Sequence, residues 1–246
     1  MTDLVEIDLN ADIGEGMPFD EELIKYISSC NIACGGHVGD DHSILKTLNL
    51  AKKHIVKIGA HPSYPDRINF GRKTIDISIK DLIQSIDFQL HNFKNKCEQI
   101  NVVWHHIKFH GALYNDIKLD NEKALALVNL ISEKYPEIIL YVPPNSEIKR
   151  AAKGKIMTCV EGFADRAYNE DLSLVPRSVP GAVILKTEKV IQQVNDLLLF
   201  QKVNTINGTY QPINIQTLCL HGDTPGALEL TKAIVEFLNK NNILIK

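Results

Sequence analysis

The chain has 246 residues, of which 44% are apolar and 23% are charged, and its 27 basic and 30 acidic side chains leave a net charge of −3. This balance excludes intrinsic disorder and gives no reason to expect nucleic acid or an anionic membrane as a partner. The five cysteines are odd in number and mostly isolated, which is typical of reduced thiols, and the acidic start of the chain does not resemble a signal peptide. We therefore expect a soluble cytoplasmic protein.

Short β-rich segments alternate with longer amphipathic segments along the chain. Strands are predicted at Leu4–Asn10, Asn31–Cys34, Val56–His61, Val102–His110, Ile138–Pro143, Lys155–Val160 and Asn214–His221. Helices are predicted at about 20–29, 40–54, 78–97, 121–134, 145–152, 186–203 and 224–240. Strands that are separated by helices favour parallel βαβ units with right-handed crossovers. Seven such units, without a linker or an internal repeat, predict a single domain over residues 1–246 with the α/β architecture of a seven-stranded (β/α) barrel.

Polar side chains gather at the carboxyl end of nearly every predicted strand. They are Asn10 and Asp12, His37 and Asp40, His61, His110, Glu161 and Asp165, and His221 and Asp223. In a parallel barrel the βα loops converge at that end, whereas an open doubly wound sheet would concentrate such residues at one switch point. Their spread over six strands favours a closed or nearly closed barrel with a site at the carboxyl ends of its strands.

The first strand ends in three polar residues on one face. Because side chains alternate along a strand, Asp8, Asn10 and Asp12 face one way and Ile7 and Leu9 the other. Burying these polar groups is costly unless they bond to one another, to a ligand or to a metal. The alternative is that Asp8 and Asp12 only brace the turn, but no turn requires so many polar residues.

The second and third predicted strands also lead into unusual connections. Glycines before His37 let the backbone approach a ligand closely, although a structural zinc site is not expected, because no Cys-x2-Cys pair is present. Prolines stiffen the long connection Pro62–Thr74 that follows His61. Arg72 in this connection can bind a carboxylate or a phosphate, or it can be an ordinary surface arginine.

The fourth predicted strand places His106, Lys108 and His110 on one face. A buried lysine beside histidines has a perturbed pKa, which is common where protons are transferred. The structural alternative is that Lys108 forms an ion pair with Asp8 or Glu161 across the barrel, and this does not exclude a functional role.

With these motifs in place, the chain resembles the LamB/YcsF family over essentially its whole length. The resemblance rests on residues 8–15, 31–40, 58–72, 108–115, 163–168, 176–177 and 221–223, which occur in the family's order. It implies a barrel of the glycoside hydrolase and polysaccharide deacetylase type. It also implies an activity, the ATP-dependent opening of the lactam 5-oxo-L-proline to L-glutamate, performed with two partner subunits, B and C. No Gly-x4-Gly-Lys-[Ser/Thr] phosphate loop is present, so part of the ATP site is expected to come from those partners.

This activity suggests roles for the polar residues. Asp12, His61 and His110 are candidates for the proton transfers to and from water and the lactam nitrogen. The candidate substrate-binding residues are Asn10, Glu15, Asn31, His37, Arg72, Lys108, Arg177 and His221.

Two other functions remain open on the sequence. In a metal-dependent deacetylase, Asp12, His37 and His61 would bind a divalent metal. In a non-catalytic substrate-binding subunit, the same pocket would bind a ligand and the partners would perform the chemistry.

Overall fold

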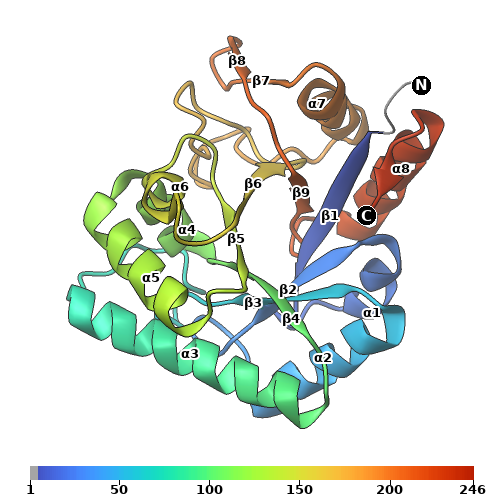
Figure 1. Cartoon of the computed structure of the whole chain (residues 1–246). Helices are drawn as coiled ribbons and strands as arrows, with labels where there is room; N and C mark the ends of the chain where they lie inside the picture. Colours follow the sequence, from blue (N-terminus) through green and yellow to red (C-terminus); the bar gives the residue numbers. More distant parts are fainter. Residues whose placement is uncertain (1–4) are drawn as a thin grey trace.

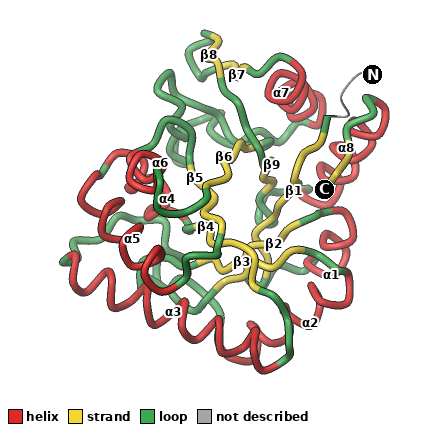
Figure 2. The backbone as a smooth tube through the Cα atoms, viewed as in Figure 1, coloured by secondary structure: helices red, strands yellow, loops and turns green. Residues whose placement is uncertain are grey.

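The computed structural model describes residues 5–246, so Leu4, the first residue of the first predicted strand, lies outside the described residues. Seven parallel strands form a closed barrel (Figures 1 and 2), which confirms the predicted fold. They are β1 (Glu6–Ile13), β2 (Ser29–Ala33), β3 (Lys57–His61), β4 (Trp104–Lys108), β5 (Ile139–Val142), β6 (Thr158–Phe163) and β9 (Thr217–Leu220).

The first and last strands of the barrel close it. Asp8 of β1 lies opposite Thr217 of β9, and Glu161 of β6 lies opposite the same threonine on the other side. A short strand, β10 (Leu244–Ile245), pairs with the beginning of β1. The closure gives every barrel strand two neighbours, so their polar backbone groups are paired within the barrel.

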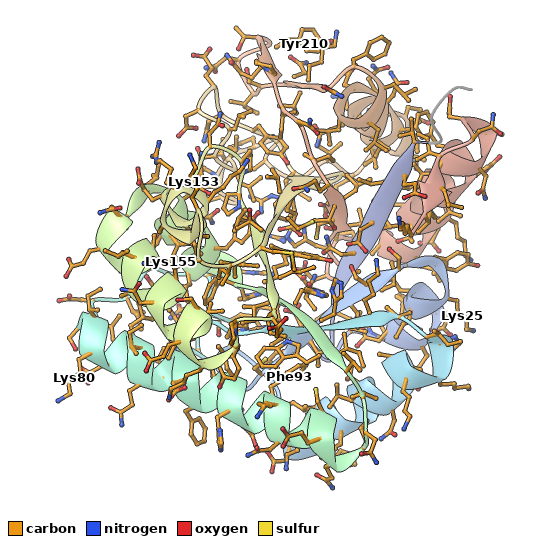
Figure 3. The ribbon with its side chains drawn as sticks, viewed as in Figure 1. Lys25, Lys80, Phe93, Lys153, Lys155 and Tyr210 are labelled. Carbon is orange, nitrogen blue, oxygen red and sulfur yellow. The ribbon has the colours of Figure 1, made fainter. Side chains whose placement is uncertain are left out.

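Helices surround the strands (Figure 2). They are α1 (Asp20–Leu23), the 3-10 helix η1 (Ile24–Tyr26), α2 (Asp41–His54), α3 (Ile79–Gln99), α4 (Gly111–Leu119), α5 (Asn121–Lys134), α6 (Glu147–Ala152), α7 (Thr187–Leu199) and α8 (Ala227–Lys240). Several begin at a side chain that accepts a backbone N–H, as Ser78 does for α3 and Asp120 for α5. Phe93 of α3 is buried against Trp104 of β4, whereas the labelled Lys25 and Lys80 lie at the periphery (Figure 3). None of the helices within residues 5–246 is long and apolar enough to cross a membrane.

The elements differ from the sequence prediction mainly at their ends. Strands β1 and β6 each continue three residues beyond their predicted ends, so Asn10, Asp12 and Glu161 are inside strands. Helix α4, which was not predicted, begins immediately after His110. Another unpredicted feature is the antiparallel pair β7 (Lys202–Asn204) and β8 (Tyr210–Pro212), which lies at the top of Figure 1.

Gly59 of β3 makes room for a histidine inside the barrel. It lies opposite His106 of β4 at a point where the register shifts. A Cβ atom at Gly59 would lie only 2.1 Å from His106 Nε2. The missing side chain on β3 therefore allows the imidazole ring to lie in the barrel interior.

Candidate active site

A pocket of about 610 Å³ opens at the carboxyl ends of the strands. Eight of the predicted site residues line it: Asp12, Glu15, His61, Arg72, Lys108, His110, Arg177 and His221. Asn10, Asn31 and His37 do not line it; they contact the lining residues Lys108, Asp12 and Glu15, respectively. The barrel topology thus brings together side chains from β1, β3 and β4 and from the connections that follow β6 and β9.

Lys108 joins two carboxylates inside the barrel. Its Nζ atom lies 2.9 Å from Asp12 Oδ1 and 3.0 Å from Glu161 Oε1, and all three side chains are buried. Nζ also contacts Cys219 Sγ at 3.0 Å, so the three N–H groups of the ammonium are directed at the protein. The ion pair with Glu161 confirms the structural role considered for Lys108, and Asp12 is its second partner in place of Asp8.

The charges of this cluster stabilise one another. Burial opposes ionisation of Asp12, but the neighbouring His61 and Lys108 hold the pKa of its carboxyl well below the usual range. Burial likewise opposes the charge of Lys108, but Asp12, Cys219 and Glu161 raise its pKa well above the usual value. Asp12 is therefore a carboxylate and Lys108 an ammonium ion at neutral pH.

A chain of side-chain hydrogen bonds supports this cluster from below. His106 Nε2 lies 2.8 Å from Asn31 Oδ1, and Asn31 Nδ2 donates to Asn10 Oδ1 and to Asp12 Oδ1. Asn10 Nδ2 in turn donates to Glu161 Oε1. Each amide accepts a hydrogen bond with its oxygen and donates with its nitrogen, so donors and acceptors follow in one order from His106 through Asn31 and Asn10 to Glu161. Asn10 and Asn31 thus orient the carboxylates and have no contact with the pocket.

His61 and His110 face each other in an unusual way. His61 Nδ1 lies 2.7 Å from the carbonyl oxygen of Lys108, and His110 Nε2 lies 2.9 Å from that of Phe70. Carbonyl oxygens only accept, so both of these nitrogens carry hydrogen. The other two nitrogens, His61 Nε2 and His110 Nδ1, lie 3.0 Å apart, and in neutral rings both present lone pairs. A proton or a metal ion at this point would remove the repulsion between them.

Two carboxylates flank the facing nitrogens. Asp12 Oδ2 lies 3.4 Å from His61 Nε2, and Glu15 Oε1 lies 3.4 Å from His110 Nδ1. Burial, followed by the charges of His37 and His61, lowers the pKa of His110 well below its usual value. His110 is therefore neutral at physiological pH and can accept a proton.

These four residues could hold a metal ion, and only Asp12 and His61 among them belong to the predicted metal-binding set. One ligand atom each from Asp12, Glu15, His61 and His110 lie within 4.8 Å of one another. His37 lies outside this group: its Nε2 contacts Glu15 Oε1 at 2.9 Å, its Nδ1 contacts Ser63 Oγ, and its ring stacks on His110. The structure thus places Glu15 and His110 where the sequence analysis had placed His37.

The outer part of the pocket is rich in guanidinium groups. Arg72 and Arg177 both contact the carboxylate of Asp223, and Arg166 also lines the pocket. His221 is held by Asp165, whose carboxylate lies 3.0 Å from His221 Nδ1. Phe163 stacks against the His221 ring, which fixes its plane.

The sequence analysis did not assign a site role to two residues that line this pocket and to one that lies behind it. Glu161, which contacts Lys108 behind the pocket, is considered there only as a polar strand end and as an ion-pair partner of Lys108, because β6 is predicted to end at Val160. Tyr114 belongs to the unpredicted helix α4 and lines the pocket. Arg166 gave no periodic signal, because it lies in an irregular connection.

Comparisons with known proteins relate nearly the whole chain to one family. The model of the LamB/YcsF family matches residues 7–246. The A subunit of 5-oxoprolinase from Haemophilus influenzae (strain PittEE) is 42% identical over 241 residues, which cover 98% of each chain. The protein of the same name from Acinetobacter baumannii (strain AB307-0294) is 41% identical and covers 98% of this chain and 97% of its own.

A solved structure shares the fold as well. The lactam utilization protein from Thermus thermophilus superposes with a TM-score of 0.90 at 32% sequence identity. The alignment covers 98% of this chain and 99% of that protein.

Proposed function

This chain belongs to the LamB/YcsF family, and from that premise we propose that it is the lactam-opening subunit of an ATP-dependent 5-oxoprolinase. In this proposal it opens 5-oxo-L-proline to L-glutamate together with partner subunits B and C. The observation that carries the proposal is the facing pair His61 and His110, flanked by Asp12 at the base of the pocket.

The chemistry of a lactam explains why such a pair is needed. A five-membered lactam is a resonance-stabilised amide, so attack by water requires an activated carbonyl carbon and a group that removes the proton of the water. ATP, when bound in the complex, would supply the activation by transferring its γ-phosphoryl group to the amide oxygen and leaving as ADP. After the C–N bond opens, hydrolysis of the resulting acyl phosphate would release inorganic phosphate and glutamate.

The histidine pair can handle both proton transfers. His61 Nε2 and His110 Nδ1 together have room for one shared proton, and the carboxylate of Asp12 stabilises the cation that results. The pair accepts a proton from the attacking water and returns it to the lactam nitrogen as the ring opens. Lys108 acts indirectly, because its N–H groups are directed at Asp12, Glu161 and Cys219 and keep Asp12 ionised.

One coupled assay tests this function. The isolated chain should release negligible glutamate from 5-oxoproline, whereas a mixture with both partner proteins should release glutamate and ADP together. His61→Ala and His110→Ala should each lower that joint rate by at least about 100-fold, as expected for loss of a general base. His91→Ala on the exposed face of α3 is the matched control and should leave the rate unchanged. Coupled turnover by this chain alone would contradict the shared site.

A metal-assisted amide hydrolase is the second candidate, and the four-residue cluster favours it. Asp12, Glu15, His61 and His110 would hold a divalent metal, and the two ring nitrogens that bond to carbonyl oxygens already fix the imidazole orientations. When bound, the metal would polarise an amide carbonyl and lower the pKa of a bound water.

Elemental analysis combined with the metal, ATP and partner dependence of the activity decides between the two candidates. The second candidate predicts about one Zn²⁺ or Mn²⁺ per chain after growth with added metal, and its loss from a His61→Ala/His110→Ala double variant. Amide hydrolysis that requires the metal but neither ATP nor the partners would favour the second candidate. Absence of metal together with full joint activity in chelator would remove it.

A further inference from the structure

Arg166 is a buried cation that forms no salt bridge with a carboxylate of residues 5–246. It lies at the start of the connection between β6 and α7, and its side chain is only 5% exposed. Its Nε donates to the carbonyl oxygen of Ala182 at 3.3 Å and its Nη2 to that of Val175 at 2.6 Å. Within residues 5–246, no carboxylate oxygen lies within 4.0 Å of its guanidinium group.

The adjacent carboxylate is already engaged elsewhere. Asp165 accepts hydrogen bonds from the Thr224 hydroxyl and from the backbone N–H of His221, and it contacts His221 Nδ1. Lys108, the comparable buried cation, contacts two carboxylates. Because an unpaired buried charge is costly, the uncompensated state of Arg166 points to an anion that completes the site.

Arg166 has unused N–H donors beside the pocket. A guanidinium has five N–H groups, of which two are bonded to Ala182 and Val175. Its Nη1 atom has no hydrogen-bond acceptor among the described residues, and the side chain lines the pocket. A planar group with free N–H donors is suited to a carboxylate or a phosphoryl group.

The surroundings carry further positive charge. Burial, and then the nearby guanidinium of Arg177, lower the pKa of Arg166 to about 10; the Asp165 carboxylate opposes this shift, and Arg72 adds a smaller lowering effect. Arg166 still remains protonated at neutral pH. Arg72 and Arg177 share the carboxylate of Asp223, and the carboxylate of Asp165 is engaged by His221 and Thr224. The three guanidinium groups in this part of the pocket therefore have only two carboxylates near them, and both are already bonded to other groups.

We propose that Arg166 is a substrate-binding residue that anchors an oxyanion of the ligand, either a carboxylate or a phosphoryl group, and makes the site selective for anionic ligands. The choice of 5-oxoproline as the ligand rests on the proposed function, but the anion site itself does not. The competing explanation is structural, because the bonds to Val175 and Ala182 also hold the connection in place. The two explanations differ in how much the loss of Arg166 should weaken the binding of ligands that carry no negative charge.

Calorimetric titration of the full chain separates them. The probes are 5-oxo-L-proline, its neutral amide 5-oxoprolinamide, L-glutamate and inorganic phosphate. Arg166→Gln should weaken binding of 5-oxoproline by about 10- to 100-fold, as expected for loss of a charge-assisted hydrogen bond, and should change binding of the neutral amide less than about threefold. Arg166→Lys, which keeps the charge and disturbs the connection less, should give an intermediate loss. Arg150→Gln on α6 is the control and should bind like the unaltered protein.

The outcomes are distinguishable. If phosphate competes with 5-oxoproline and also depends on Arg166, the site accepts a phosphoryl group; if only the carboxylate probes depend on Arg166, it binds a carboxylate. Equal weakening of 5-oxoproline and its amide, or no dependence of any anionic probe on Arg166, would overturn the proposal. Failure of the unaltered three-subunit mixture to release glutamate would instead count against the proposed function, and the phosphate and glutamate titrations would still report on the anion site.

Discussion

At the scale of single residues, the interior of the barrel depends on Lys108. Replacing it with methionine keeps much of the volume but leaves Asp12 and Glu161 as buried carboxylates without their cation. We expect Lys108→Met to lower the free energy of unfolding by about 3–5 kcal/mol, the usual cost of breaking a buried ion pair. Urea denaturation followed by circular dichroism would measure this.

A surface lysine provides the matched control. The ammonium of Lys155 donates to the side-chain oxygen of Asn129 at an exposed site, so Lys155→Met should change stability by less than about 0.5 kcal/mol. Similar stability losses for both variants would mean that the Asp12–Lys108–Glu161 cluster does not stabilise the fold.

The same scale shows how far the candidate site could be predicted. Asp12, His61, Lys108 and His110 were found because strand alternation and barrel topology place them at one end of the barrel. The sequence does not distinguish the residues that line the pocket from those that lie behind it, such as Asn31 and His37. The distinction depends on which side-chain nitrogen or oxygen meets which partner, and sequence spacing does not encode this.

At the scale of elements, β3 and β4 are coupled through Gly59. Gly59→Ala would place a methyl group 2.1 Å from the His106 ring, so strand and ring must move apart. We expect a loss of about 3 kcal/mol, the upper end of the usual cost of overpacking a core. Thermal and urea denaturation of Gly59→Ala would measure it.

Two further variants identify the cause. Gly208→Ala, at a positive φ of 80° with open space around it, should cost only about 1 kcal/mol. Gly59→Ala should cost less stability in a His106→Ala background than in the unaltered protein, because the imidazole ring that the new methyl group would crowd is absent. The prediction is contradicted if Gly59→Ala costs the same whether or not the imidazole is present.

Elements were predicted well where periodicity is strong and poorly where tertiary contacts decide. The long helices α2, α3, α5 and α8 follow their amphipathic patterns closely. The sequence pattern does not predict helix α4, because the polar motif that precedes it indicates a strand end and the helix has only nine residues. Strands β1 and β6 continue through polar residues because those residues satisfy one another across the barrel, which a hydrophobic pattern does not reveal.

At the scale of the whole molecule, buried histidines tie stability to pH. Burial lowers the pKa values of His37, His106 and His110 in the folded protein, whereas the unfolded chain binds protons on these rings near pH 6.5. Unfolding therefore takes up protons below this pH, and stability should decrease as the pH falls from 7.5 to 5.5, by up to about 1.4 kcal/mol per histidine. Asp20 opposes the trend, because burial raises its pKa to about 6 and the folded form gains a proton first.

Urea denaturation at several pH values would test this dependence. His106→Gln removes one of the buried rings and should reduce the slope of stability against pH. The control His91→Ala on the exposed face of α3 should leave the slope unchanged. A stability that is flat or rises toward pH 5.5 would contradict the prediction.

The closure of the barrel by β9 against β1 also has a consequence for how the protein is made. During synthesis on a ribosome, the partners of β1 on one side emerge early, but Thr217–Leu220 appear only after more than 200 residues have been translated. Until then the Asp12–Lys108–Glu161 cluster lacks the wall that Cys219 provides, and the edges of β1 and β6 remain unpaired. Such late, long-range pairing slows folding and exposes strand edges to association with other chains. A nascent chain of this protein is therefore a candidate client for chaperones until its last barrel strand has docked.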